Sequence, residues 1–374
     1  MTALRPDPDF EVIRIGLQVL ANVSVAGQKH QQAIWSRCFP DLFVSLAGLQ
    51  SRQTCDPLCM LVYTCCDGSP ELYQVICDIL VQIICTVCSV GFGEDWFKLL
   101  VSRLCLEDVY FPVLFSKLKD ASVGDDGFSS EQGFLLRVVS DIVNERIEEI
   151  RAPRDFALCV LGIFRKSVGL VDFFSRVKSG LPTDCVSVNV LGYSVSILRD
   201  VCAREDPSGC DSEDDVVGRL LSSGLIELFL SLLCDLEPPA IIRKAMRVSE
   251  KEEGTSSYSA KTCPYMGFRK DIVAVIGNCA YRRKHVQDEI RERNGILLLL
   301  QQCVADEENP FLREWGIWSV RNLLEGNAEN QQVVADLEVQ GSVDVPELAG
   351  LGLKVEVDQQ TRRAKLVNVG AKAS

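Results

Sequence analysis

The chain has 374 residues, of which 47% are hydrophobic and 24% are charged. This composition is too apolar for a disordered protein and provides enough side chains for a large core. The 39 basic and 52 acidic residues leave a formal net charge of −13, and no basic stripe suggests nucleic-acid binding. No apolar run reaches the ~20 residues that cross a bilayer, and the first ten residues lack the apolar core of a signal peptide. We therefore expect a soluble intracellular protein that binds neither nucleic acid nor membrane.

Helical periodicity dominates the chain. Apolar residues recur three and four positions apart in segments that predict helices, in chain order, at 10–25, 71–90, 96–118, 133–150, 156–176, 186–202, 217–234, 270–280, 290–304 and 314–324. Polar, Gly/Ser-rich stretches interrupt these helices at 116–132 and 249–265. Alternating residues at 353–357 and 364–369 predict a small β-hairpin near the end of the chain.

Three of the helical segments share one template. In each, an Asn is followed nine residues later by a Gln and twelve residues later by an aliphatic residue, as in Asn322/Gln331/Val334, Asn278/Gln287/Ile290 and Asn22/Gln31/Ile34. Weaker copies place Tyr63, Asp141 and Asp200 at the Asn position. The first two sets are 44 residues apart, and a helical repeat of about 40–47 residues is typical of armadillo and HEAT proteins.

We therefore predict an all-α fold, an armadillo/HEAT-like α-solenoid superhelix with a possible C-terminal β-hairpin. Helical repeats with loop insertions are expected over 1–235, and a flexible linker over 236–265. A C-terminal group of repeats is expected over 266–340, followed by a tail over 341–374. Neighbouring repeats of this kind bury one continuous core between them.

The residues that enzymes and metal sites need are scarce. The two histidines, His30 and His285, fall in predicted exposed turns, and no HExxH, GxSxG or P-loop motif occurs. The CxxC of Cys85 and Cys88 lies inside an apolar helical run, whereas zinc sites usually need two such clusters flanked by turns. We expect no catalysis, cofactor or metal, and we expect the 17 cysteines to pack mostly as small hydrophobic residues in a reducing compartment.

The C-terminal repeats resemble a known family. Residues 268–331 contain IGN at 276–278, NGI followed by leucines at 294–300, and NPFLREWGIWSVRNL at 309–323. These motifs resemble the C-terminal domain of the ataxin-10 family, and residues 16–46 resemble an internal armadillo-like segment of the same family. The resemblance implies a non-enzymatic, cytoplasmic protein that acts by binding others or itself, with a link to cytokinesis and, in animal members, to signalling through protein glycosylation.

In that family, further helical repeats precede the segment that 16–46 resembles. The chain is therefore expected either to be a shortened form or to expose an apolar face on its first helices, which would need a cap or a partner.

Trp318 and Asn322 are four residues apart and share one helix face. The spacing resembles the binding helices of importin-type armadillo repeats. There the amide bonds the backbone of an extended peptide, and the Trp ring stacks on a basic side chain. Alternatively, the amide bonds the neighbouring repeat and Trp318 fills the core. Arg321 would repel a basic guest.

The candidate partner-binding residues are Asn22, Asn278, Trp318, Arg321 and Asn322. The leading hypothesis is a protein–protein interaction scaffold. The alternative is a receptor that binds extended basic peptides along an Asn-lined concave groove.

Overall fold

The computed structural model describes residues 9–66, 73–88, 95–108, 110–119, 127–146, 149, 151–175, 179–204, 215–243, 260–337, 353–357 and 364–368. The chain divides into two compact units, Met1–Glu325 and Gly326–Ser374. The larger unit contains helices alone, as far as it is described, and the smaller unit contains one helix and two strands.

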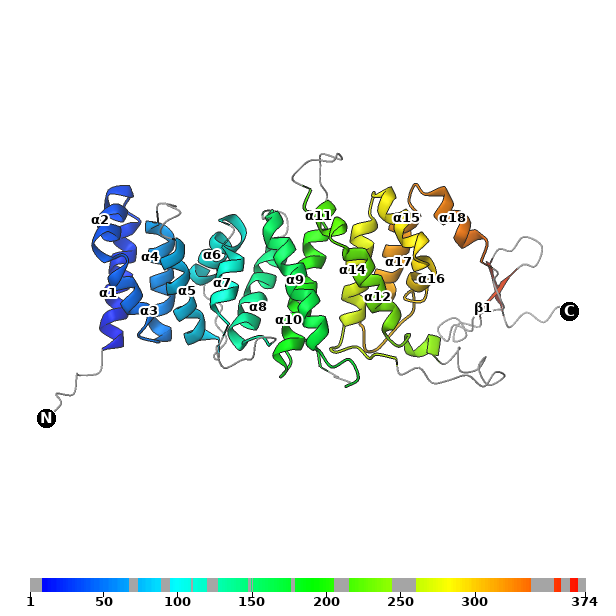
Figure 1. The fold of residues 1–374 in the computed structure, drawn as a ribbon, viewed down its shortest axis with the longest axis horizontal. Coiled ribbons are helices and arrows are strands. Elements are labelled where there is room, and N and C mark those ends of the chain that lie inside the picture. Colours follow the sequence, from blue (N-terminus) through cyan, green and yellow to red (C-terminus); the bar gives the residue numbers. More distant parts are fainter. Residues whose placement is uncertain are drawn as a thin grey trace. The chain divides into compact units, whose positions relative to one another are not determined.

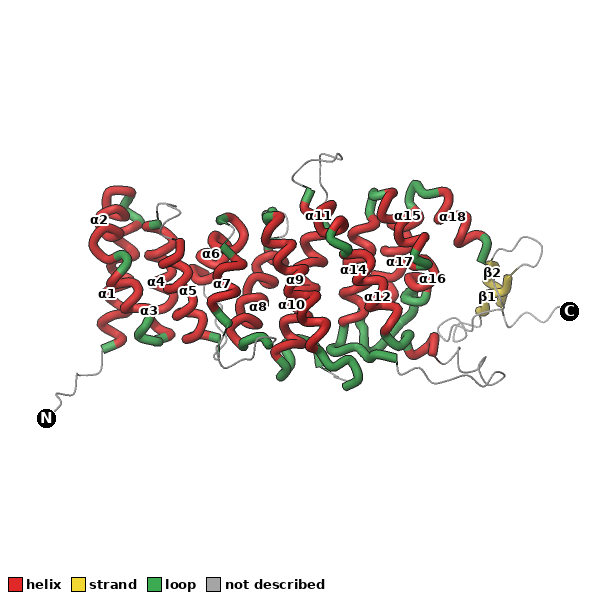
Figure 2. The backbone as a smooth tube through the Cα atoms, in the orientation of Figure 1, coloured by secondary structure: helices red, strands yellow, loops and turns green. Residues whose placement is uncertain are grey.

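The helices of the larger unit form two layers, and within each layer the helices follow chain order (Figures 1 and 2). In the first layer each helix packs against the next: α1 (Phe10–Ser24), α4 (Arg52–Cys65), α6 (Asp95–Ser102), α8 (Ser130–Glu145), α10 (Val186–Cys202), α14 (Phe268–Ala280) and α17 (Leu312–Leu324). The second layer contains α2 (Gln28–Cys38), α3 (Asp41–Ala47), α5 (Tyr73–Val87), α7 (Phe111–Lys117), α9 (Arg154–Leu170), α11 (Val216–Ser222), α12 (Leu225–Asp235), α15 (Lys284–Glu292) and α16 (Gly295–Leu300).

The core lies between the two layers. In α5 the residues Ile79, Leu80, Ile83 and Ile84 are all fully buried, which follows from their spacing of three and four along one helix face. Aromatic rings connect helices of the second layer, such as Phe164 of α9 and Phe229 of α12 with centroids 4.9 Å apart. Burying each such side chain stabilises the fold by roughly 1.5–3 kcal/mol. The predicted all-α armadillo-like solenoid is confirmed.

Three of the predicted helices are in fact interrupted. The segment 96–118 becomes α6, a π-helical turn η2 (Arg103–Glu107) and α7, because Pro112 in the first turn of α7 begins a new helix. The segment 217–234 divides at Gly224, whose φ of 78° is left-handed. The segment 290–304 divides into α15 and α16 at Asn294, with φ of 59°. Helices α2, α3 and α4 were missed, since their apolar periodicity is interrupted by polar residues and by Pro57.

The cysteines only partly follow the expectation of core packing. Cys77, Cys105 and Cys279 are buried, whereas Cys85 and Cys234 are exposed because they lie on helix faces turned away from the core. Among the described residues, no three His, Cys, Asp or Glu side chains are placed to hold a metal ion.

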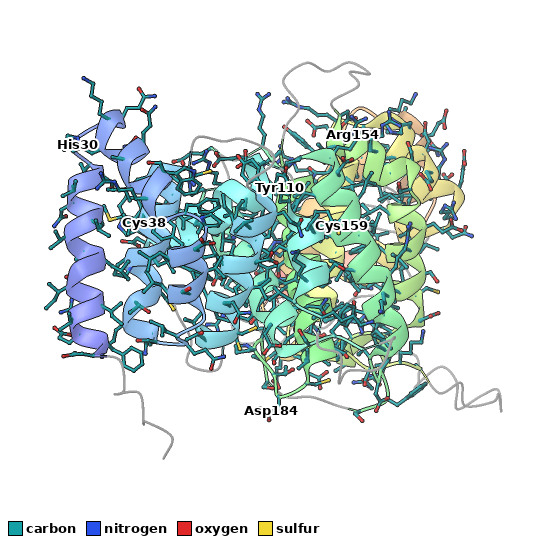
Figure 3. The ribbon with its side chains drawn as sticks, turned by 60° about the vertical axis from the view of Figure 1, so that its left-hand side comes forward. His30, Cys38, Tyr110, Arg154, Cys159 and Asp184 are labelled. Carbon is teal, nitrogen blue, oxygen red and sulfur yellow. The ribbon has the colours of Figure 1, made fainter. Side chains whose placement is uncertain are left out.

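The histidines are exposed as predicted, but they lie in the first turns of helices rather than in turns between them. His30 is in α2 at the surface of the molecule (Figure 3), and His285 is in α15. Within the described part of the chain, no single helix is long and apolar enough to span a bilayer. Helices α11 and α12 reach that length and composition only as a pair, and the pair is bent by 61°.

The smaller unit contains the predicted β-hairpin. Strand β1 (Leu353–Val357) pairs antiparallel with β2 (Ala364–Asn368), with Val355 opposite Leu366. Before it stands α18 (Ala328–Ala335), whose N-cap Asn327 accepts a hydrogen bond from the backbone N–H of Asn330. Most of the predicted tail, 341–374, lies outside the described residues, and the domain division at 235 and 266 stays a prediction.

Candidate interaction surface

Asn322 bonds to the neighbouring helix. It is only 3% exposed, and its Nδ2 donates to the carbonyl oxygen of Gly277 in α14 at 3.0 Å. The last four carbonyls of a helix have no partner within that helix. The carbonyl of Gly277 is one of these, because the backbone N–H of Tyr281 donates to Asn278 instead. Asn322 therefore caps the end of α14 while it holds α17 against that helix.

Asn278 repeats this arrangement one helix earlier. Its Nδ2 donates to the carbonyl oxygen of Arg199 in α10 at 3.1 Å, although the side chain is partly exposed. Gly277 permits the close approach of α17, because a Cβ there would lie 2.2 Å from the Oγ of Ser319. The Oγ of Ser319 in turn donates to the carbonyl of Val273. Within the IGN motif, Gly277 thus provides both the carbonyl acceptor and the close contact, and Asn278 provides the amide donor.

The Gln of the template completes the connection between repeats. Gln287 of α15 is buried, and its Nε2 lies within hydrogen-bond distance of the carbonyl oxygens of Ala280 (3.2 Å), Asn322 (2.8 Å) and Glu325 (3.3 Å). Ala280 ends α14, and the other two residues stand at the end of α17. One side chain therefore satisfies carbonyls at the ends of two consecutive helices of the first layer.

A buried network of charges joins α8, α10 and α14. The Arg199 guanidinium donates to Asp200 at 2.7 Å and to Asp271 at 3.1 Å, and Tyr265 donates to Asp271 at 2.9 Å. Asn144 of α8 donates to Asp200 at 3.3 Å. Burial and then the charge of Asp271 raise the pKa of Tyr265 well above its usual value, so the phenol remains a donor.

Burial by itself would lower the pKa of Arg199. The hydrogen bond with Asp200 and the charges of Asp200 and Asp271 outweigh burial and raise that pKa. The guanidinium therefore keeps its charge in the network.

Trp318 lies at the surface rather than in the core. Its side chain is 50% exposed, and the guanidinium carbon of Arg321 lies 4.7 Å from the centre of its ring. A cation–π contact of this kind stabilises an exposed pair by about 0.5–1 kcal/mol. The face of Trp318 that was predicted to meet a guest's basic side chain is thus covered by a basic residue of the same helix. Phe311 and Ile317 are also exposed, so α17 presents an aromatic and aliphatic surface.

Asn22 does not join the other template residues. It is exposed on α1, the first described helix. The same helix exposes an aliphatic row, Val12, Ile15, Val19 and Val23, which matches the predicted apolar face.

Asn278, Asn322 and Gln287, which bond between repeats, all belong to the template that the sequence shows. Arg199 and Asp271 lie outside the template and are 72 residues apart in the sequence.

Comparisons with known proteins agree with the motifs of the C-terminal repeats. Residues 268–367 match the family described as the spinocerebellar ataxia type 10 protein domain. Ataxin-10 from Xenopus tropicalis is 26% identical over 374 residues, covering 94% of this chain and 69% of that protein. Human ataxin-10 is 26% identical over 364 residues, covering 92% of this chain and 69% of that protein. The ataxin-10 homolog of Dictyostelium discoideum is 41% identical over 93 residues, covering 25% of this chain and 15% of that protein.

A designed armadillo repeat protein of known structure overlays on 84% of this chain and 95% of its own, with a TM-score of 0.32 and 14% identity. The fold assignment rests on the helix packing itself. Two layers of helices, connected by amide–carbonyl bonds between successive repeats, define an armadillo-like α-solenoid, a class of protein-interaction scaffold. The chain is thus similar to ataxin-10 proteins over nearly its whole length, and its C-terminal repeats match the family model of the spinocerebellar ataxia type 10 protein domain.

Proposed function

We propose that this chain is a non-enzymatic scaffold that acts in the cytoplasm, holds protein partners and regulates cytokinesis or a cell-signalling process. The observation that carries the proposal is the exposed surface of α17, defined here as Phe311, Ile317, Trp318 and Arg321. Phe311 is 71% exposed and Ile317 is 53% exposed. Aromatic residues and Arg are the side chains that contribute most to binding energy at protein interfaces.

The α17 surface stands on a rigid support. Asn322 and Gln287 hold the end of α17 in place, and Gly316 lies so close to the neighbouring turn that a Cβ there would be 2.6 Å from the carbonyl oxygen of Gln302. A surface that is already ordered loses little entropy when a partner binds. This supports a role for Trp318 and Arg321 in contacts with other proteins.

The alternative, a receptor with a row of free amides, has less support. That role needs amides that can bond to the backbone of a guest peptide, and the Nδ2 groups of Asn278 and Asn322 both donate to carbonyls of neighbouring helices. We therefore assign partner binding to the α17 surface rather than to the Asn positions.

The test replaces the endogenous protein with the variant Trp318→Ala/Arg321→Ala and compares the captured partners and the fraction of multinucleate cells. A matched control, Phe174→Ala/Arg154→Ala, removes another exposed aromatic residue and another exposed arginine. We expect partners to be lost and division to fail with the first variant alone. Full partner recovery with both variants would contradict the role of the α17 surface.

The same proposal includes self-association of the chain. Sedimentation of the purified chain measures its oligomeric state and so tests this part.

A further inference from the structure

The exposed aliphatic row of α1 occupies positions that later repeats bury. The row is Val12, Ile15, Val19 and Val23, whose side chains are 39% to 63% exposed. Aligning the repeats on the Asn of the template gives the counterparts of Val12, Val19 and Val23, which are Phe268, Val275 and Cys279 in α14, and Leu312, Ser319 and Leu323 in α17. Each of these counterparts is at most 1% exposed. Something covers this side of α14 and α17 that does not cover it on α1.

The preceding first-layer helix provides that cover. On this side of α17, the Oγ of Ser319 donates to the carbonyl oxygen of Val273 in α14. Three residues later, the Nδ2 of Asn322 donates to the carbonyl oxygen of Gly277. Because the acceptors follow the same order as the donors, the two helices run parallel. Asn278 of α14 donates in the same way to a carbonyl of α10. No helix precedes α1 within the described part of the chain, so its matching side is open.

The contact between α14 and α17 shows what a covering helix must provide. It offers a carbonyl from its last turn, because only the last four carbonyls of a helix have no partner within it. It is narrow at that point, since a Cβ on Gly277 would lie 2.2 Å from the Oγ of Ser319. On α1 the position of Ser319 holds the larger Val19, and the position of the charged Asp271 holds Ile15. A helix that covers α1 therefore needs a small residue near its end and an uncharged apolar stripe.

A second copy of the chain does not meet these requirements. Its α1 would offer only the same apolar row, because Ala21, at the position that presents the carbonyl in α14, is buried on the other side of the helix. Its α17 would place the guanidinium of Arg321 against Ile15, without a carboxylate such as Asp271, which balances the equivalent arginine of α10. These observations favour a helix of a different protein.

We propose that the row of α1, together with Asn22, docks one amphipathic helix of a partner protein. The docked helix runs parallel to α1 and packs an uncharged apolar stripe, with Gly or Ala in its last turn, on the row. It ends beside Asn22, whose Nδ2 donates to one of its free carbonyls. The partner thereby adds one helix to the first layer. The inference rests on the scaffold function above and gives the scaffold a second surface, on a different helix from the α17 surface.

The test measures the binding of defined helical peptides to the full chain by fluorescence anisotropy. Three peptides of about 15 residues are held helical by a lactam bridge, because short isolated helices are marginal in water. The first has a Leu/Ile stripe with Gly in its last turn. The second has the same composition in a shuffled order without a stripe, and the third carries Arg within the stripe. We expect the first, striped peptide to bind at least about tenfold more tightly than the other two.

The decisive variant is Ile15→Lys/Val19→Lys, which changes two exposed side chains of the row. We expect it to weaken binding of the striped peptide at least about tenfold. The matched control is Ile241→Lys/Leu297→Lys, at aliphatic positions of similar exposure on other helices, and it should keep the affinity. Asn22→Ala removes the amide donor and should weaken binding about fivefold.

A photoreactive benzophenone at one end of the striped peptide reports the direction in which it docks. From the C-terminal end of the peptide we expect crosslinks to residues around Asn22, and from the N-terminal end to residues around Val12. The reverse pattern would overturn the parallel docking and the carbonyl contact with it.

Equal binding of the three peptides, or unchanged binding by Ile15→Lys/Val19→Lys, would overturn the proposal. A wild-type chain that sediments as a dimer, when this variant sediments as a monomer, would assign the row to a second copy and overturn it as well. Partner capture through the α17 surface without peptide binding would overturn this inference alone. Binding of the striped peptide, when Trp318→Ala/Arg321→Ala keeps every partner, would instead contradict the role of the α17 surface and support this inference.

Discussion

Replacing Asn322 with Ala separates the two roles that the sequence left open for this residue. The substitution removes the hydrogen bond from its Nδ2 to the carbonyl of Gly277 and leaves that acceptor in the interior without a donor. It does not touch the α17 surface, because Asn322 itself is buried. We therefore expect a loss of stability with little direct effect on binding.

The magnitude follows from the surroundings of the bond. Losing the bond and burying an unpaired carbonyl costs about 2–3 kcal/mol, and the better helix propensity of Ala offsets about 0.5 kcal/mol of this. The net decrease in the free energy of unfolding is then about 2 kcal/mol. Asn278→Ala is the comparison variant. Its acceptor, the carbonyl of Arg199, also receives the backbone N–H of Ala203, so that substitution costs about 1 kcal/mol or less.

The assay is urea unfolding followed by circular dichroism, combined with hydrogen exchange of α14 and α17. Both are needed because helical repeats can unfold in parts, and one global midpoint then averages over them. A local loss of about 2 kcal/mol speeds exchange in the last turns of α14 and α17 roughly 30-fold. The reasoning is refuted if Asn322→Ala unfolds like the wild type, within about 0.5 kcal/mol, yet no longer captures partners.

Three further substitutions or measurements test other contacts. Gly316→Ala places a Cβ 2.6 Å from a backbone oxygen of the preceding turn and should cost about 1–3 kcal/mol in urea unfolding. The control Gly162→Ala meets no atom within 4 Å and should be neutral or stabilising. Asp271→Ala removes the acceptor that the partly buried Arg199 guanidinium shares with the buried phenol of Tyr265 and should lower the free energy of unfolding by about 3 kcal/mol; an unchanged urea midpoint would contradict the network. Burial raises the pKa of Cys77 to about 11, so at pH 8 this thiol should resist maleimide until the protein unfolds, whereas the exposed Cys85 reacts at once; labelling of Cys77 in the native state would contradict its burial.

Periodicity predicted the helices whose apolar stripe is continuous. Helices α1, α10 and α17 begin and end within two residues of the predicted bounds. It failed where a break depends on one backbone conformation, as at Gly224, because periodicity does not report φ. It also failed for α4, in which cysteines and a proline stand where aliphatic residues would have revealed the pattern.

The candidate site was predictable to the level of residue positions but not of partners. Repeat comparison identified Asn322 as a special position, but a sequence does not show whether an amide faces a guest or the helix before it. Trp318 was expected either to fill the core or to stack on a basic side chain of a guest peptide. Its side chain is instead exposed, and the guanidinium of Arg321, three residues later, lies over the ring.

The acceptors of Asn278 and Asn322 are backbone carbonyls, of Arg199 and Gly277 respectively. Every amino acid has such a carbonyl, so the repeat that receives the bond does not need a particular side chain at that point. A connection of this kind constrains one residue type per repeat rather than a matched pair. Neighbouring repeats can therefore change their sequences independently while the spacing between them stays fixed. This allows a solenoid to diverge widely in sequence and still keep one architecture.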